Sequence, residues 1–589
     1  MTYRKLISFV WQYIRQQPIP YLFIFLLSFT WAVDATVWPY LIGYLIDKVS
    51  TFNEARTTAI TTLALPAIFA ICLGFFIRSC FGIQGLLLAK AQPKLEADIR
   101  MTMFNHVQRH SPQYFNDHFA GSLSNKISDM TSQIEFLLRL LLTTFIPAGA
   151  ACVIGMLFFF FINPFFAYLI AGWYLIHFLI CLSFVSKCAN YEHIHGEARS
   201  SLVGKLVDSF TNNFAVNLFC RFDYERKLLA TLQKDEQQKN YRAKRYAEFL
   251  RIALTIEAFF IGSVGIPGIA IYFWVHEKIT TGELVQIIGT SDSILLVIWI
   301  AGLSLPSFFQ GIGITQQAFS IMDDPQDIQD DSYAKSLTVS EGEVEFVNVS
   351  FQYNEKRLFT NKSVLIKAKE RIGLVGYSGA GKSTFVNLIL RFYQIEKGKI
   401  LIDGQDISKV TLESLRKQIL LIPQDPILFH RTLKENIQYG NLNATDEEVI
   451  NASKLAHCHE FIQQCPHQYQ SIVGERGTNL SVGERQRIAI ARAMLSEAKI
   501  LILDEATSAL DSITENFIHQ SLETLMQDHT TIVIAHRLST LVKMNRILVF
   551  NHGEIIEEGT HTDLLAKKGH YARMWHMQAG GFLPATPPA

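Results

Sequence analysis

The first half of the chain is dominated by long apolar runs separated by longer polar segments. A helix needs roughly 20 apolar residues to cross about 30 Å of hydrocarbon, and six runs reach that length. They are residues 19–46, 59–89, 140–162, 164–185, 252–275 and 284–305. Only Asn163 and Pro164 lie at the junction of the third and fourth runs, which predicts a tight turn on one side of the membrane. The pattern predicts an all-α domain with six membrane spans.

The distribution of basic residues predicts which ends of the spans face the cytoplasm. Three segments are rich in lysine and arginine, namely 1–18, 90–126 and 187–251. The opposite loops carry only Lys48, Arg56 and Lys278. Because basic residues are retained on the cytoplasmic side, both termini are predicted to be cytoplasmic. The polar segments 90–135 and 187–251 keep a helical period, so we expect the spans to continue into the cytoplasm as a stalk.

Residues 1–18 precede the first run without the features of a cleavable signal peptide. Arg4, Lys5 and Arg15 are interspersed with apolar residues at helical spacing, which predicts an amphipathic helix on the membrane surface. The transmembrane domain is then expected to cover residues 19–320, including its cytoplasmic extensions.

Several polar residues interrupt the predicted spans. They are Asp34, Arg78, His177, Glu257 and Asp292. Ionisable side chains are costly in lipid, so we expect them to face the interior of the bundle. They either line a substrate path or pair helices with one another, and the sequence alone leaves both roles open.

Beyond the last run the pattern becomes that of a linker and a water-soluble domain. Residues 321–343 form an acidic, proline-containing stretch that is typical of a linker. From 344 to 580, short β-branched runs alternate with helical stretches, and 581–589 form a tail. The predicted fold is therefore multi-domain, with a six-helix all-α transmembrane domain followed by an α/β domain.

One loop of the α/β domain has the composition of a phosphate-binding loop. It consists of Gly376, Tyr377, Ser378, Gly379, Ala380, Gly381, Lys382, Ser383 and Thr384. A predicted strand precedes it and a helix follows, as in P-loop nucleoside triphosphatases. The glycines let backbone N–H groups surround phosphates, Lys382 can reach the β- and γ-phosphates, and Ser383 can ligate Mg²⁺.

A second feature of this domain is an apolar strand, residues 500–503, that ends in two acids. Asp504 can hold the Mg²⁺ shell, and Glu505 can polarise the attacking water. A strand-end acid pair is common by itself, but together with the upstream loop it indicates a site for nucleotide hydrolysis.

A further motif gives the chain a family resemblance. Residues 479–487 read Asn-Leu-Ser-Val-Gly-Glu-Arg-Gln-Arg and resemble the signature motif of ATP-binding cassette (ABC) proteins. Gln424 resembles the Q-loop residue, Asp511 belongs to a segment like the D-loop, His536 resembles the switch histidine, and Tyr353 resembles the aromatic that stacks on adenine. Together with the six spans, these motifs resemble bacterial ABC exporters over essentially the whole chain.

The resemblance implies a set of roles and a setting. The α/β domain would be a P-loop ATPase with a helical subdomain. The whole chain would be a multi-pass protein of a bacterial inner membrane, with this domain in the cytoplasm. Ser481 and Gly483 of one subunit would reach ATP bound to the 376–384 loop of the other. His536 would contact the γ-phosphate, and Gln424 would join the Mg²⁺ shell and sense the membrane domain. The chain would work as a dimer, either of two copies or with a different partner.

The signature segment departs from the usual Leu-Ser-Gly-Gly-Gln of the family. Val482 replaces a glycine, and Glu484 replaces the glutamine. Ser481 and the second glycine are retained, so activity is expected to survive. Val482 adds bulk where backbone approaches phosphate and could slow closure.

Histidines and cysteines gather in one segment of the α/β domain. They are His457, Cys458, His459, Cys465 and His467. Their spacing matches no structural zinc pattern, so we expect them to belong to a surface helix. The chain's eight cysteines show no disulfide framework.

Overall composition narrows the function further. The chain has 589 residues and equal numbers of acidic and basic residues, 53 each, which argues against a nucleic-acid partner. The predicted function is ATP-driven export or flipping of a hydrophobic or amphipathic substrate, and lipids, lipid-linked glycans, drugs and peptides share this architecture. An ATP-gated channel or a regulatory membrane ATPase without transport is the alternative.

Overall fold

A computed structural model describes most of the chain. The described residues are 3–52, 59–118, 120–326, 328–353, 356–474, 477–504, 512–535 and 537–579. They divide into two compact units, each treated separately below. The first comprises Met1–Arg109 and His118–Pro325, and the second comprises His110–Asp117 and Gln326–Ala589.

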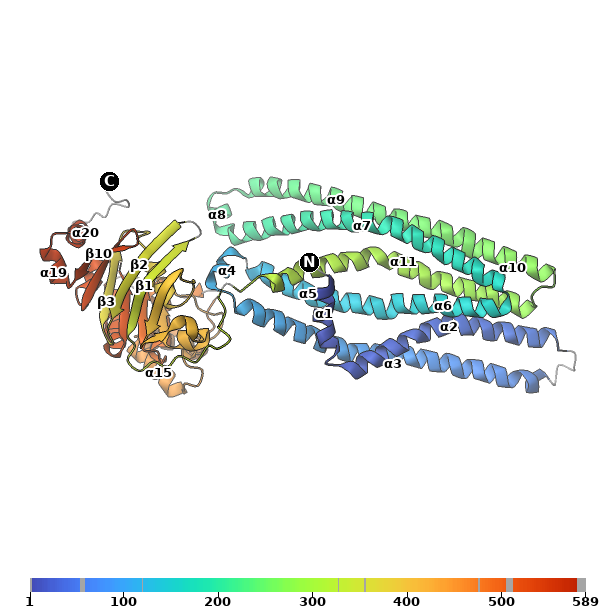
Figure 1. Cartoon of the computed structure of the whole chain (residues 1–589), viewed down its shortest axis with the longest axis horizontal. Helices are drawn as coiled ribbons and strands as arrows, with labels where there is room; N and C mark the ends of the chain where they lie inside the picture. The colour runs from blue at the N-terminus through green and yellow to red at the C-terminus, as the bar shows by residue number, and fades with distance from the viewer. Residues whose placement is uncertain are drawn as a thin grey trace. The chain divides into compact units, whose positions relative to one another are not determined.

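The first unit is entirely helical, and its long helices lie side by side in Figure 1. The elements are α1 (Tyr3–Ile14), α2 (Pro18–Ser50), α3 (Ala59–Gln108), α5 (Ala120–Leu140), η1 (Leu141–Phe145), α6 (Ile146–Ile162), α7 (Pro164–Thr211), α8 (Asn213–Leu218), α9 (Phe222–Glu257), η2 (Ala258–Gly265), α10 (Ile266–Val275) and α11 (Thr281–Asp323). Among the described residues, six helical stretches are long and apolar enough to cross a membrane. The predicted span 59–89 overlaps the stretch Leu63–Gln108, each of the other predicted spans lies within one stretch, and most of the helices continue well beyond the apolar runs.

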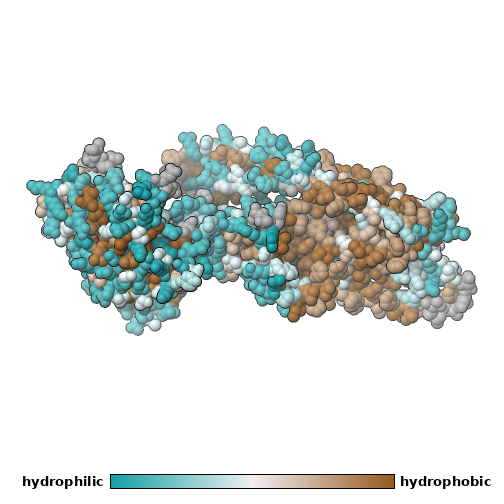
Figure 2. All heavy atoms as spheres, in the orientation of Figure 1, coloured by the Kyte–Doolittle hydropathy of each residue, from teal (hydrophilic) through white to brown (hydrophobic). Residues whose placement is uncertain are grey.

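A belt of apolar side chains covers much of the surface of this helical unit (Figure 2). Leu65, Phe75 and Phe161 are each at least three-quarters exposed, which would be unfavourable in water. Inside the bundle, small residues allow close packing: a Cβ at Gly155 would lie 2.3 Å from Ile294 Cδ1, and one at Gly262 would lie 2.1 Å from Leu295 Cδ1. Both features are those of helices that associate within lipid.

Two of the spans contain a wider, π-helical segment. The segments η1 and η2 end directly before Ile146-Pro147 and Ile266-Pro267. Proline has no N–H to donate to the preceding turn, so the backbone there adopts another hydrogen-bonding pattern. The hydrophobic period alone contains no signal for these interruptions.

The intramembrane polar residues differ in their burial within the single chain. His177 and Glu257 are buried, at 7% exposure each, and Asp34 is half-buried. Arg78 and Asp292 are exposed on the surface of this single chain. The Arg78 guanidinium donates one hydrogen bond to the Gly74 carbonyl of its own helix, at 3.2 Å. The exposure of each of these side chains therefore depends on which face of its helix it occupies, and not on the residue type.

The second unit is built on two sheets. The strands are β1 (Val344–Tyr353), β2 (Lys356–Ile366), β3 (Arg371–Gly376), β4 (Lys397–Ile402), β5 (Gln405–Asp406), β6 (Ile419–Ile422), β7 (Ile500–Asp504), β8 (Thr530–Ile534), β9 (Arg546–Asn551) and β10 (Glu554–Gly559). One sheet has the order β2-β1-β4-β5 and is antiparallel, and the other has the order β10-β9-β3-β8-β7-β6. In the larger sheet all pairs are parallel except β9 with β10.

Helices complete this α/β unit. They are α4 (Pro112–Asp117), α12 (Lys382–Ile389), α13 (Leu412–Lys417), α14 (Leu433–Gln438), α15 (Asp446–Leu455), α16 (His459–Gln464), α17 (Val482–Met494), α18 (Ser512–Leu525), α19 (His561–Ala566) and α20 (His570–Ala579). Helices α14 to α17 form a helical subdomain between β6 and β7. Its core of Ile437, Val449, Ile462 and Ile488 is fully or almost fully buried.

Candidate functional site

The phosphate-binding loop follows β3 and leads into α12. Gly376 has φ +152° and its Cβ, if present, would lie 2.2 Å from the Phe550 carbonyl oxygen, so only glycine fits. Gly381 caps α12 with φ +105°, in the left-handed region that glycine tolerates. Lys382 is buried, and its Nζ donates to the carbonyls of Gly376 at 2.6 Å and Tyr377 at 3.1 Å. The loop thus wraps around its own lysine.

Seven consecutive residues of this loop line one cavity of about 300 Å³. They are Ser378, Gly379, Ala380, Gly381, Lys382, Ser383 and Thr384, and the other lining residues are Tyr353, Lys356 and Leu358. The loop backbone and side chains therefore surround a space at the amino-terminal end of α12, where the helix dipole favours an anion.

Tyr353, the predicted adenine-stacking residue, lies at the same cavity. Its hydroxyl is 3.2 Å from Thr384 Oγ1, and its ring packs edge-on against Tyr393 at 5.1 Å between centroids. Burial, together with the neighbouring Tyr353 hydroxyl, raises the pKa of Tyr393 to about 12, so that phenol stays neutral. The aromatic ring of Tyr353, at the end of β1, and the loop that follows β3 thus lie at the same cavity.

The other predicted residues follow the carboxyl ends of neighbouring parallel strands. Strand β8 lies between β3 and β7, and β6 lies beside β7. Asp504 ends β7, and Gln424 follows β6 by two residues. The loop after β3, Asp504 and Gln424 therefore lie along the same edge of the sheet, where ligands of open α/β sheets bind. Glu505, Asp511 and His536 lie outside the described residues.

The predicted signature segment forms the start of α17. Ser481 is the N-cap residue, and its side chain and that of Glu484 bond to each other's backbone N–H groups. Gly483 is buried, whereas Val482 is exposed. Ser481 and Gly483 are not among the residues that line the cavity surrounded by the loop.

Two residues that the sequence analysis did not single out connect α17 with the segment around Gln424. Arg485 Nη2 lies 3.2 Å from Asp425 Oδ1, and Gln486 Nε2 donates to the Gln424 carbonyl at 3.4 Å. Gln486 is 1% exposed, which is unusual for glutamine. Their position next to the signature residues was a signal that they matter. Their partners could not be predicted, because Gln486 and Gln424 are more than 60 residues apart in the sequence.

The histidine- and cysteine-rich segment contains a helix, as expected: α16 begins at His459 and exposes Glu460, Gln463 and Gln464. Cys458 is completely buried in the core of the helical subdomain, where burial raises its thiol pKa to about 12. A thiol packs as a small apolar group, which explains its place. His459 Nδ1 instead contacts the Tyr469 hydroxyl at 2.8 Å. Among the described residues, no three His, Cys, Asp or Glu side chains are arranged to hold a metal.

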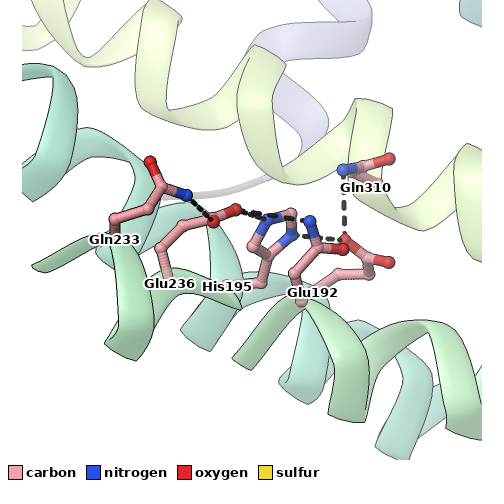
Figure 3. Close-up of polar contacts among 6 residues, drawn as sticks. Glu192, His195, Gln233, Glu236 and Gln310 are labelled. Carbon is pink, nitrogen blue, oxygen red and sulfur yellow. Dashed lines mark hydrogen bonds and ion pairs between the residues drawn. The ribbon is translucent and has the colours of Figure 1, made fainter. Parts of the chain in front are cut away.

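A polar cluster joins three helices of the first unit beyond the predicted spans (Figure 3). His195 Nε2 lies 2.9 Å from Glu236 Oε1, so α7 contacts α9. Gln310 Nε2 donates to Glu192 Oε2 at 3.1 Å, which connects α11 with α7. Gln233 also donates to Glu236, at 3.1 Å. The His195, Glu192 and Glu236 side chains are between 12% and 18% exposed, so the cluster is largely shielded from solvent.

Known protein families match segments in both halves of the chain. Residues 359–508 match the ABC transporter family, and residues 21–291 match the ABC transporter transmembrane region. An "Uncharacterized ABC transporter ATP-binding protein" of Haemophilus influenzae is 34% identical over 577 residues, covering 94% of this chain and 91% of that protein. A "Putative multidrug export ATP-binding/permease protein" of Staphylococcus aureus is 33% identical over 548 residues, with coverages of 92% and 94%.

A solved structure extends the similarity to the whole fold. The structure of a bacterial Atm1-family ABC exporter with ATP bound superposes with a TM-score of 0.87 at 28% sequence identity. It covers 97% of this chain and 99% of that one. A P-loop ATPase fused to six membrane helices is thus the class of protein that fold and site define. The chain belongs to the ABC transporter family, as an exporter half-transporter.

Proposed function

We propose that two copies of this chain form a homodimer that couples ATP hydrolysis to export of a hydrophobic or amphipathic substrate. ATP-driven export by a multi-pass membrane protein follows from the family. The observation that carries the finer proposal is the cavity that residues 378–384 share with Tyr353. It offers an aromatic surface for a base next to a cradle for phosphates, as ATP requires.

The residues have the following proposed roles. Tyr353 stacks on adenine, and residues 376–384 surround the phosphates with backbone N–H groups. Lys382 exchanges its bonds to the Gly376 and Tyr377 carbonyls for bonds to phosphate oxygens. Glu505 orients and polarises the attacking water, and His536 contacts the γ-phosphate. Ser481 and Gly483 complete the site of the second subunit, and Asp511, in the segment that resembles the D-loop, contributes to nucleotide binding.

The oxygen-rich end of the site fits Mg²⁺. Ser383 lines the cavity, while Asp504 and Gln424 follow the adjacent strand ends, and hydroxyl, carboxylate and amide oxygens are suitable Mg²⁺ ligands. When bound, Mg²⁺ neutralises charge on the β- and γ-phosphates. Gln424 has a second proposed role, because its backbone is tied to α17 through Gln486. A shift of Gln424 would therefore move the signature helix.

The class of substrate and the location rest on the membrane unit. Few charged residues interrupt the apolar helices, which favours a hydrophobic or amphipathic cargo. The Staphylococcus aureus relative carries the name of a multidrug exporter. The asymmetry of basic residues favours a cytoplasmic location of the ATPase unit. The relatives from Haemophilus influenzae and Staphylococcus aureus favour the inner (plasma) membrane of a bacterium.

Glu505→Gln tests the catalytic role in purified protein reconstituted into nanodiscs. We expect ATP to bind with unchanged affinity while steady-state hydrolysis is lost, and normal turnover would contradict the assignment. Lys382→Ala should weaken nucleotide binding itself. Substrate transport is measured separately, as ATP-dependent uptake of lipid and drug probes into inside-out vesicles. Passive conductance opened by ATP, without uptake, would favour a channel instead.

A further inference from the structure

Glu484 binds the serine of the signature segment from within the same helix. Its Oε2 accepts hydrogen bonds from the Ser481 N–H at 2.8 Å and from the Ser481 hydroxyl at 2.8 Å. The Glu484 N–H in turn donates to Ser481 Oγ at 3.3 Å. The Ser481 hydroxyl, which meets phosphate in the proposed function, is therefore bound to a carboxylate, and so is the Ser481 N–H.

The position of this carboxylate resembles that of a bound anion. Helix α17 is 13 residues long, and Glu484 is the acidic residue of its first turn. The amino-terminal end of a helix attracts negative charge, through its free N–H groups and its dipole. A glutamine in this position, as in the usual family motif, would make a similar cap without the charge.

We propose that Glu484 is a positioning residue that competes with the γ-phosphate for Ser481 and thereby opposes closure of the dimer around ATP. The inference rests on the proposed function, in which Ser481 meets ATP held by the second subunit. For the Ser481 hydroxyl to donate to phosphate, its charge-assisted bond to Glu484 has to break. The released carboxylate then stays close to the phosphate and repels it.

The chain contains a matched control for this arrangement. Thr445 and Glu448 form the same capping box at the start of α15. Glu448 Oε2 accepts from Thr445 N at 2.7 Å and from Thr445 Oγ1 at 3.0 Å, and the return bond measures 3.3 Å. Glu448→Gln therefore makes the same chemical change at a helix start outside the proposed site.

The test measures steady-state ATPase activity of the full-length protein in nanodiscs as a function of ATP concentration. Removing the charge should lower the KM for ATP in Glu484→Gln by about threefold to tenfold, because neutral hydrogen bonds are weaker than charged ones. Glu448→Gln should leave the KM unchanged. The difference between Glu484→Gln and the unmodified protein should also shrink at high salt, since salt screens the repulsion.

Three outcomes would overturn the proposal: an unchanged or higher KM in Glu484→Gln, an equal decrease in Glu448→Gln, or a decrease that salt does not alter. Comparison with Glu484→Ala separates the effect of charge from that of helix capping. Glu484→Ala removes both the charge and the cap and should lower thermal stability, whereas Glu484→Gln removes only the charge and should not. If the unmodified protein hydrolyses ATP and Lys382→Ala does not, these outcomes count against the role of Glu484 alone. Absence of hydrolysis in the unmodified protein would overturn the proposed function and this inference together.

Discussion

His177 Nδ1 lies 3.1 Å from Glu257 Oε2, between two helices of the membrane-spanning unit. The second carboxylate oxygen of Glu257 accepts a hydrogen bond from Trp173 Nε1. His177 and Trp173 belong to α7, whereas Glu257 ends α9 directly before the π-helical segment η2. The His177 and Glu257 side chains are only 9% and 6% exposed. Both oxygens of a buried carboxylate are thus satisfied across the contact between α7 and α9.

Removing the Glu257 carboxylate should destabilise the membrane unit. In Glu257→Ala, His177 and Trp173 would stay buried without their acceptor, and breaking a buried pair costs about 3–5 kcal/mol. The measurement is thermal unfolding of the purified protein in detergent. Glu248→Ala is the control on the same helix, because its pair with Arg251 is more than half exposed, with side chains 54% and 53% accessible. An exposed pair contributes about 1 kcal/mol or less. Equal unfolding temperatures for the two variants would contradict the role of Glu257.

The polar cluster of Figure 3 predicts an effect on coupling rather than on hydrolysis. Gln310 connects α11 to Glu192 of α7, and α11 is the helix that leads into the ATPase unit. Gln310→Leu removes this donor from Glu192, whose side chain is 18% exposed, and the loss of one such hydrogen bond costs about 1 kcal/mol. We expect the amount of probe transported per ATP hydrolysed to fall severalfold while basal ATPase activity is retained.

The control for this variant is Asp235→Asn on α9, whose side chain is 52% exposed and pairs with Lys239 of its own helix. It should leave the transport-to-hydrolysis ratio unchanged. A Gln310→Leu protein with the unmodified ratio would show that the cluster is not part of the coupling between the helices.

The fold class and the phosphate-binding loop could be predicted because their signals are local. Apolar runs of membrane length predict spans without knowledge of their neighbours, and a glycine-rich loop between a strand and a helix is recognisable in one segment. The strand β3 and helix α12 around residues 376–381 illustrate this. The proximity of Tyr353 to that loop followed only from the family resemblance.

The remaining contacts depend on how distant segments meet. The pairing of His177 with Glu257 requires the relative rotation of two long helices, which periodicity does not determine. The burial of Cys458 and the exposure of Arg78 also depend on distant neighbours, because a residue type does not specify which side of a segment is covered. The capping box of Ser481 and Glu484 was visible in the sequence spacing, but its conflict with phosphate became apparent only from the geometry.

Gly376→Ala should be far more damaging than the same change at another turn glycine. Its Cβ would lie 2.2 Å from the Phe550 carbonyl oxygen, and backbone atoms of an adjacent central strand have no room to shift. Gly404, in the turn after β4, also has a positive φ of +75°, but a Cβ there would meet nothing within 4 Å. Gly404→Ala should therefore cost only left-handed strain, about 1–2 kcal/mol.

Thermal unfolding without nucleotide compares these two glycine variants independently of any effect on phosphate binding. Gly376→Ala should express poorly or unfold at a clearly lower temperature than Gly404→Ala. Similar unfolding temperatures would mean that the loop and β9 separate at little cost.

The ionisation of Asp403 should make the attachment of the segment that precedes β1 depend on pH. Burial by itself would raise the pKa of this carboxyl, but N–H groups of four successive residues from Ser340 to Glu343 donate to it, and together they lower the pKa. The four donor distances lie between 2.7 and 3.2 Å. The ionised carboxylate therefore fastens the end of the linker to the turn between β4 and β5.

Asp403→Asn should destabilise the protein at neutral pH and much less in acid. Because the folded-state pKa is depressed, the stabilisation is fully present above the unfolded value of about 3.9, and it is lost as pH falls from there through the folded-state pKa. Thermal unfolding between neutral pH and pH values below about 4 should show the two proteins converging at the acid end. Glu413→Gln, whose exposed carboxylate pairs with Lys417 of the same helix, should change stability little at any of these pH values. A constant difference between Asp403→Asn and the unmodified protein would show that the side-chain oxygens, and not the charge, hold the linker.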